Sequence, residues 1–153
     1  TREKTPVMTT EETPFEIGRA EIFREGKNVT IIGCGPLVYE ALKAAEELAK
    51  EGIEAEVINN HTIKPMDKET ILKSVKKTGC VVTIEEHQAA GGMGSAVSEI
   101  LSQNHPAPVE IIGVKDRFGE SGEPSELMEK FGLTAENIVE AVKKVLKRKS
   151  KFD

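Results

Sequence analysis

The stretch from Glu85 to Ser95 concentrates the side chains that could do chemistry. Glu85-Glu86-His87 sets two carboxylates beside an imidazole, and such groups can transfer protons. Gly91-Gly92-Met93-Gly94-Ser95 follows at a predicted helix start, where bare backbone N–H groups suit a small anion. The motif contains no nucleophile, and His61 and His105 lie too far away in sequence to suggest a zinc site. We therefore expect a structural or interface role here rather than catalysis.

Two other segments invite a functional interpretation. Gly33-Cys34-Gly35 follows a strand and opens a helix, as a dinucleotide-binding fingerprint would. However, the third glycine would fall at Val38, Pro36 removes an N–H donor, and no acidic residue ends the next strand at Ile58-Asn59. The glycines are thus predicted to serve a tight turn. The loop from Asp116 to Glu123 mixes charges, glycine and one Phe, and docking against another surface is at least as plausible there as chemistry.

Hydrophobic periodicity predicts the elements that position these segments. Runs buried on both faces alternate with helical patterns, which indicates a parallel sheet covered by helices on each side. Pro36, Asp67 and Thr134 fit helix starts, and Gly52 and Gly79 fit helix ends. The expected strands are 20–24, 29–32, 55–58, 80–84 and 109–112, and the expected helices begin near residues 36, 67, 93 and 134.

The first two strands are separated by a short polar turn, Glu25-Gly26-Lys27-Asn28. Because a parallel pair needs a much longer crossover, we expect these strands to be antiparallel neighbours, with the first at the sheet edge. The fold prediction is therefore α/β: three layers, α/β/α, with a mostly parallel five-stranded sheet and one antiparallel edge strand. In such sheets, ligands collect outside the carboxyl ends of the strands.

Composition and charge exclude several classes of function. The 153 residues carry a formal net charge of −5, which does not favour nucleic acid or an anionic bilayer. No apolar run is long enough for a membrane span, and with no Trp and one Tyr there is no platform for stacking bases. Basic residues gather after position 142, where they complement a helix C-terminus. Cys34 and Cys80 are expected to be free thiols of a cytoplasmic protein.

Domain organisation is predicted as an arm, 1–18, followed by one domain, 19–153. The arm holds Pro6, Pro14 and a polar stretch with no helical or alternating period. Because the chain starts at Thr1 with charged residues rather than Met, we expect it to be a piece of a longer protein, with the arm leading from a preceding domain.

Seven motifs follow one another along the chain: Phe15–Ala20, Arg24-Glu25-Gly26, His61–Asp67, Glu85-Glu86-His87, Gly91–Val97, Asp116–Gly122 and Phe131–Thr134. Together and in this order they resemble a known family, the C-terminal domain of transketolase, most closely the type whose gene is split into two subunits. The match extends over nearly the whole chain, and several ordered motifs are far more specific than any one of them.

The resemblance implies a parent enzyme that moves a two-carbon ketol unit between sugar phosphates with thiamine diphosphate and Mg²⁺. In the family, that cofactor lies between a pyrophosphate-binding and a pyrimidine-binding domain, usually at a dimer interface. This chain resembles neither domain, so no catalytic, cofactor-binding or metal-binding residue is expected here. The expected partners are those two domains or subunits, in a parent homodimer, with no nucleic acid and no membrane.

What remains for this chain is domain packing, dimer support and an interface or effector edge. The predicted edge residues are Glu85, Glu86, His87, Gly91, Gly92, Gly94, Ser95 and Asp116. Two relatives share the domain and remain alternatives: 1-deoxy-D-xylulose-5-phosphate synthase and the β-subunit of 2-oxoacid dehydrogenases. A different class also remains open, a stand-alone regulatory module that binds a small anion at the helix start of Gly91–Ser95.

Overall fold

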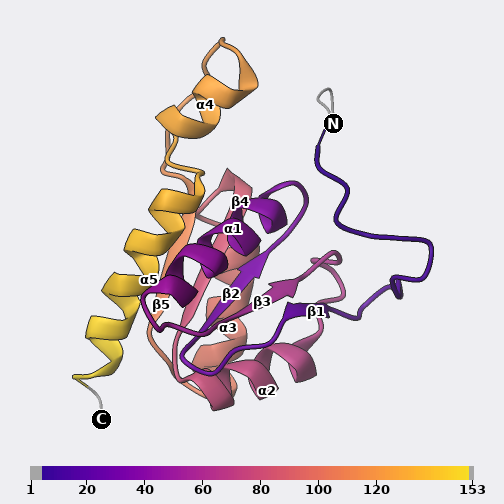
Figure 1. Cartoon of the computed structure of the whole chain (residues 1–153), viewed down its shortest axis with the longest axis vertical. Helices are drawn as coiled ribbons and strands as arrows, with labels where there is room; N and C mark the ends of the chain where they lie inside the picture. The colour runs from indigo at the N-terminus through magenta and orange to yellow at the C-terminus, as the bar shows by residue number, and fades with distance from the viewer. Residues whose placement is uncertain (1–4, 152–153) are drawn as a thin grey trace.

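The computed structural model describes residues 5–151, and a mixed five-stranded sheet lies between two layers of helices (Figure 1). The strands are β1 (Glu21–Arg24), β2 (Val29–Gly33), β3 (Ala55–Asn59), β4 (Val81–Gln88) and β5 (Val109–Val114). The helices are α1 (Leu37–Lys50), α2 (Lys68–Thr78), α3 (Met93–Asn104), α4 (Pro124–Lys130) and α5 (Ala135–Lys149). The three-layer α/β/α prediction with one antiparallel edge strand is confirmed.

The strand order β1-β3-β2-β4-β5 corrects the predicted pairing of the first two strands. β1 pairs antiparallel with β3, and β3 lies between β1 and β2. The four-residue turn can cross one intervening strand because strands lie about 4.8 Å apart and extended residues span about 3.3 Å each. Lys27 and Asn28 donate their backbone N–H groups to the Glu54 carbonyl, which holds the turn against the start of β3.

Each face of the sheet has its own apolar core. α1 and α5 cover one face and α2 and α3 cover the other. The first core is built around Ile31, Val57 and Leu48, and the second around Ile32, Ile58 and Val97. Consecutive residues of β2 and β3 thus enter opposite cores, which explains why these strands read as continuous apolar runs.

The predicted helix caps form. The Asp67 carboxylate accepts hydrogen bonds from Thr70 N–H at 3.0 Å and, from a distant segment of the same chain, from Ala20 N–H at 3.0 Å. Burial alone would raise the pKa of Asp67, but these amides, together with the Thr70 hydroxyl that donates to the carboxylate at 2.8 Å, outweigh it and hold the pKa below its ordinary value. Thr134 caps α5, as its position before the apolar stripe predicts.

Helix α4 lies in a segment predicted to be a long loop. It spans only seven residues, begins with Pro124 at its first position and buries none of its side chains fully. Short exposed helices carry little periodicity, so the proline was the one available signal. None of the described helices is long and apolar enough to cross a membrane.

Candidate functional site at the carboxyl edge of the sheet

The order in which strands are added to the sheet reverses between β2 and β4, and a cleft opens at that point. From β2 the chain passes through α1 to β3 on one side, and β4 then pairs with β2 on the other. Such a switch point leaves a crevice at the carboxyl ends of the strands. We call the crevice the carboxyl-edge cleft; it measures about 590 Å³ and takes its walls from the connections after β2, β3 and β4. Residues lining it include Cys34, Pro36, Ile63, Lys64, Glu85, Glu86, His87, Gly91 and Gly92.

Glu85 fixes the start of α3. Its side chain is 4% exposed, and its two carboxylate oxygens accept hydrogen bonds from Met93 N–H at 2.8 Å and Gly94 N–H at 3.0 Å. A carboxylate at a helix N-terminus satisfies amides that have no partner within the helix and favourably meets the helix dipole. Glu85 therefore caps α3 from the neighbouring strand, a role that the spacing of eight and nine residues does not reveal.

The paired carboxylates of the sequence are not a pair in space. Successive residues of a strand point to opposite faces, so Glu85 is buried under α3 whereas Glu86 is exposed. The exposed ring of His87 has its Nδ1 within 3.1 Å of the Gln88 carbonyl oxygen. No hydrogen bond joins these three side chains among the described contacts, so the arrangement contains no acid–base relay.

Gly92 and Gly94 permit this capping. A Cβ atom on Gly92 would lie 2.4 Å from Glu85 Oε1, and one on Gly94 would lie 2.6 Å from the side chains of Ile111 and Thr83. Both positions require the absence of a side chain because the helix start closes directly on β4 and β5.

The same contacts weigh against the alternative that a small anion binds at this helix start. The amides of Met93 and Gly94 are bonded to Glu85, and Gly91 N–H donates to Ser95 Oγ at 2.9 Å. A phosphate at this point would compete with a buried carboxylate and would be repelled by it. The loop geometry therefore does not support the stand-alone anion-binding module.

Cys34 lies in the cleft as a half-buried free thiol. Burial, with a smaller contribution from the charge of Glu85, raises the pKa of the Cys34 thiol to about 11. Because the thiolate is the nucleophilic form, Cys34 is a poor nucleophile at neutral pH. Cys34 is a free thiol, as the sequence predicts, and Cys80 is buried.

Asp116 does not line the carboxyl-edge cleft, but Gln88 connects it to the end of β4. The Gln88 side chain accepts a hydrogen bond from Asp116 N–H at 3.1 Å and donates one to the Arg117 carbonyl at 3.1 Å. Asp116 itself has a φ of 46°, a left-handed conformation that Asp tolerates better than most residues. Sequence reasoning missed Gln88; its position four residues beyond the predicted strand, 80–84, gives no sign of this double contact.

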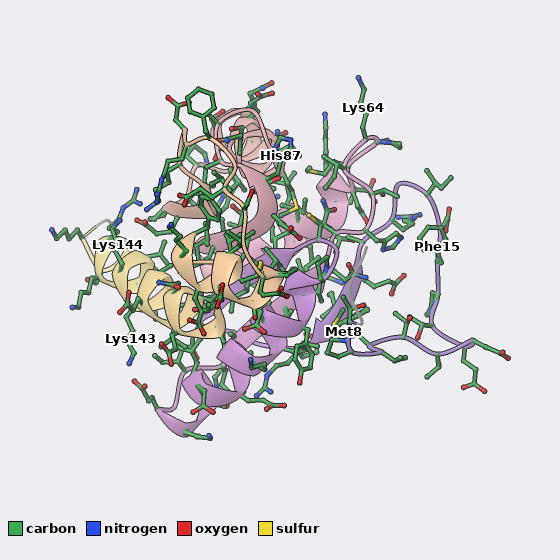
Figure 2. The ribbon with its side chains drawn as sticks, turned by 90° about the horizontal axis from the view of Figure 1, so that it is seen from above. Met8, Phe15, Lys64, His87, Lys143 and Lys144 are labelled. Carbon is green, nitrogen blue, oxygen red and sulfur yellow. The ribbon has the colours of Figure 1, made fainter. Side chains whose placement is uncertain are left out.

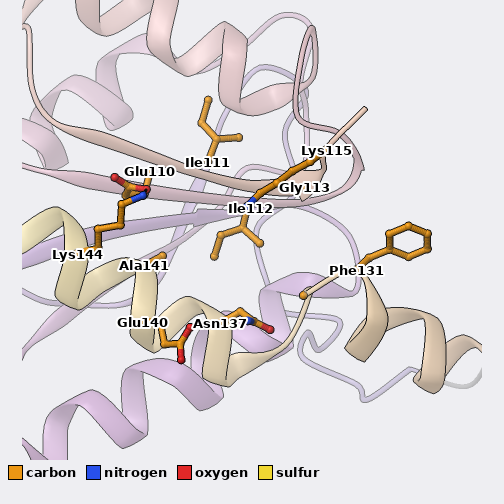
Figure 3. A pocket seen from close by; sticks show the side chains of 11 residues that line it. Glu110, Ile111, Ile112, Gly113, Lys115, Phe131, Asn137, Glu140, Ala141 and Lys144 are labelled. Carbon is orange, nitrogen blue, oxygen red and sulfur yellow. Dashed lines mark hydrogen bonds and ion pairs between the residues drawn. The ribbon is translucent and has the colours of Figure 1, made fainter. Parts of the chain in front are cut away.

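A smaller cavity of about 230 Å³ lies between β5 and α5 (Figure 3). In it Lys144 Nζ lies 2.7 Å from a carboxylate oxygen of Glu110, and Arg148 also bonds Glu110. Burial alone would raise the pKa of Glu110, but these two cations outweigh it and hold the pKa below its ordinary value. Lys144 and Arg148, two of the basic residues predicted to complement a helix C-terminus, thus anchor α5 to β5.

The described residues do not fit a metal–diphosphate cofactor. Across residues 5–151, no group of three or more His, Cys, Asp and Glu side chains is arranged to hold a metal ion. The glycine-rich helix start is capped by Glu85, and the turn before α1 carries Pro36 in place of an N–H donor. The cleft therefore lacks the groups that would bind a diphosphate and its metal. Its walls can contact an apolar or mixed molecular surface instead.

The structure brings together some of the eight predicted edge residues and separates others. Five of them line the carboxyl-edge cleft: Glu85, Glu86, His87, Gly91 and Gly92. Gly94 and Ser95 support the helix start below it, and Asp116 belongs to the neighbouring loop. Figure 2 shows His87 and Lys64 on one side of the domain and Lys143 on the other.

Comparison with known proteins gives the family. The model of "Transketolase, C-terminal domain" matches residues 18–138. The 6-deoxy-6-sulfo-D-fructose transketolase subunit SqwH of Clostridium sp. (strain MSTE9) is 52% identical over 143 residues, which cover 94% of this chain and 44% of that subunit. The 1-deoxy-D-xylulose-5-phosphate synthase of Heliobacterium modesticaldum is 44% identical over 87% of this chain and 21% of the synthase.

A solved structure titled "Split gene transketolase, inactive beta4 tetramer" superimposes with a TM-score of 0.92. It is 46% identical in sequence, and the match covers 95% of this chain and 48% of that one. This chain therefore spans less than half the length of the relatives it matches. The chain belongs to the transketolase C-terminal domain family.

Proposed function

We propose that this chain is the C-terminal part of a split-type transketolase. The observation that carries the proposal is the match to the split-gene transketolase structure, at 46% identity and a TM-score of 0.92 over 95% of this chain. The similarity to the SqwH subunit supports it, since that protein is also a transketolase subunit. The parent enzyme of this proposal transfers a two-carbon ketol unit between sugar phosphates.

Within that enzyme, the chain is a non-catalytic domain that supports packing and dimer assembly. Glu85 is engaged in capping α3, and the thiol of Cys34 is held protonated at neutral pH. In the parent, thiamine diphosphate supplies the carbanion chemistry, and it is held with Mg²⁺ by the pyrimidine-binding and pyrophosphate-binding parts. The free thiol of Cys34 suits a cytoplasmic location for this protein.

Reconstitution tests the proposal. A chimera is made in which this chain replaces the 143-residue matched region of the Clostridium SqwH subunit. The chimera, combined with the other subunit of that enzyme, is expected to show ketol transfer that depends on thiamine diphosphate and Mg²⁺. An inactive chimera that folds and assembles with its partner would contradict the transketolase assignment. Calorimetry on the 153-residue chain is expected to show no saturable heat with thiamine diphosphate and Mg²⁺, and micromolar binding would contradict the non-catalytic role.

One other parent reaction is favoured by a specific observation. The 44% identity to 1-deoxy-D-xylulose-5-phosphate synthase makes that enzyme the second candidate. A chimera that carries this chain in place of the matched region of the Heliobacterium synthase would then form 1-deoxy-D-xylulose 5-phosphate, while the SqwH chimera would stay inactive. The comparison of both chimeras therefore decides between the two parents.

A further inference from the structure

The two edge strands of the sheet differ in how open they are to further pairing. β1 has four residues, carries charges at Glu21 and Arg24, and shifts its pairing register between Ile22 and Arg24. Short length, charge and an irregular register all keep an edge strand from pairing with another chain. β5 has six residues, and its centre, Ile111-Ile112-Gly113, contains neither charge nor proline. The β5 edge therefore lacks the features that protect the β1 edge.

The hydrogen bonds of β5 show which of its backbone groups point away from the sheet. Pro108 O and Val114 O each accept a hydrogen bond on the β4 side, at 3.0 and 2.9 Å. Because backbone groups alternate in direction along a strand, the even-numbered residues of β5 face β4 and the odd-numbered residues face outward. In agreement, Arg148 Nη1 reaches Val109 O from outside the sheet, at 2.8 Å.

Ile111 and Gly113 keep their outward backbone groups free. Across residues 5–151, no strand lies beyond β5, and neither residue has a hydrogen-bond partner on its outer side. The cavity of about 230 Å³ opens beside these residues and takes its other walls from α5 and Phe131 (Figure 3). Two N–H groups and two C=O groups are thus presented at an open edge, and such a row is a template for a further strand.

The sequence of β5 is complementary to a second copy of itself. When two such strands pair antiparallel about a two-fold axis at Ile112, Ile111 of one copy faces Gly113 of the other, and each such pair exchanges both N–H···O=C bonds. The large side chain of Ile111 then lies opposite a residue without one, and Ile112, which is 9% exposed, meets its own copy. Glu110 lies opposite Val114, so no like charges oppose each other.

Helix α5 fits the same arrangement. It packs on both β4 and β5, so its axis lies about one strand spacing, about 4.8 Å, from the two-fold axis. Two α5 helices would then lie about 10 Å apart, which is the distance at which helices pack. Glu140, Ala141 and Lys144 line the cavity beside β5. Because the two-fold axis reverses the helix, Lys144 of each copy lies toward Glu140 of the other, and the small Ala141 leaves room for the approach.

We infer that two copies of this chain associate through their β5 edges, so that one sheet continues from the first copy into the second and α5 packs on its copy. The inference does not rest on the proposed function, because it uses only the backbone of β5 and the side chains of α5. The chimeras test the parent reaction, whereas the experiments below test only this pairing, so either can fail without the other.

Hydrogen exchange on the 153-residue chain tests the strand pairing. Exchange of single backbone N–H groups is followed by NMR at about 50 μM and about 1 mM protein, and sedimentation gives the association state at each concentration. In the dimer, the N–H groups of Ile111 and Gly113 are expected to exchange at least about tenfold more slowly than in an unstructured chain, and in the monomer at most about threefold more slowly. The Ile112 N–H, which faces β4, is the control and should be protected equally in both states.

Three outcomes of this experiment would overturn the inference. One is a chain that stays monomeric at both concentrations. Another is a dimer in which Ile111 and Gly113 exchange as fast as in an unstructured chain, because the copies would then meet elsewhere. The third is slow exchange of these two N–H groups in a monomer, because they would then be bonded within one chain.

A charge reversal on α5 tests the two-fold arrangement. Glu140→Lys should raise the Kd of the dimer at least about tenfold, because it places a lysine toward Lys144 of the other copy. Glu46→Lys on α1 is the matched control, since Glu46 precedes Lys50 by four positions as Glu140 precedes Lys144. It should change the Kd by less than about twofold. Circular dichroism verifies that both variants fold. An unchanged Kd in Glu140→Lys, or equal increases in both variants, would contradict the pairing.

Discussion

Removing the Glu85 carboxylate is expected to destabilise the domain, whereas removing the adjacent Glu86 is not. Glu85→Ala deletes both acceptors at the start of α3 and leaves the Met93 and Gly94 amides, which lie 2.8 and 3.0 Å from its oxygens, without a partner. Loss of a helix cap costs about 0.5–2 kcal/mol, and an unsatisfied buried donor costs about 1–3 kcal/mol. We therefore expect the free energy of unfolding to fall by about 2–3 kcal/mol, which corresponds to a Tm lower by roughly 5–10 °C.

Glu86→Ala is the matched control, since it alters the same residue type one position along β4. Its side chain is exposed, so its effect should stay within about 0.5 kcal/mol. Urea unfolding followed by far-ultraviolet circular dichroism measures both variants, because the chain has no Trp and one Tyr. Losses that are equal within about 0.5 kcal/mol would refute the capping role of Glu85.

A second measurement on the same variants addresses the anion site. In the unaltered chain, the helix start is occupied by Glu85, and added phosphate should not raise the Tm. In Glu85→Ala, the freed amides and the helix dipole should bind phosphate and restore part of the lost stability. A phosphate-dependent rise in the unaltered chain would show that the carboxylate does not block the site.

Three further predictions concern other parts of the domain. Asp67→Asn should lower the free energy of unfolding by about 1–2 kcal/mol at pH 7. Because the folded-state pKa of Asp67 lies below its ordinary value of 3.8, the difference between the two proteins should persist above pH 3.8 and vanish as the pH falls through the folded-state pKa. Parallel curves of unfolding free energy against pH for the two proteins would contradict this. Gly94→Ala should destabilise the domain by about 1–3 kcal/mol despite its better helix propensity, because its Cβ would lie 2.6 Å from side chains of β4 and β5; a raised Tm would show that the contact relaxes freely. Cys34 should react with iodoacetamide about tenfold faster for each unit of pH up to about 11, and a plateau near pH 8 would contradict the raised pKa.

Local patterns determined much of the fold. The apolar runs of β2 and β4 and the apolar stripes of α1 and α5 are strong signals. A strand buried on both faces requires consecutive apolar residues, and a helix buried on one face requires apolar residues three and four positions apart. The caps at Asp67 and Thr134 were equally readable, since each side chain bonds an amide only three residues away. The motifs quoted from the sequence also sufficed for the family.

Pairings between distant segments were not readable in this way. The predicted neighbour of β1 was β2, but β3 lies between them. The residues of a four-residue turn do not indicate whether a third strand lies between the two strands that the turn connects. The same holds for α4, whose seven residues make no periodic pattern. Topology of this kind depends on contacts that form only when the whole sheet assembles.

The candidate site shows the same division most clearly. The sequence by itself determined that Glu85, Glu86, His87 and the following glycines lie at the carboxyl edge of a parallel sheet, because strand and helix periods fix where each connection falls. Only the tertiary structure decided that Glu85 turns inward to cap α3 while Glu86 faces solvent, and that Gln88 holds the loop of Phe118. The physical reason is that a side chain's partner is chosen by the space and the unpaired donors around it, and these come from segments that meet only in the folded domain.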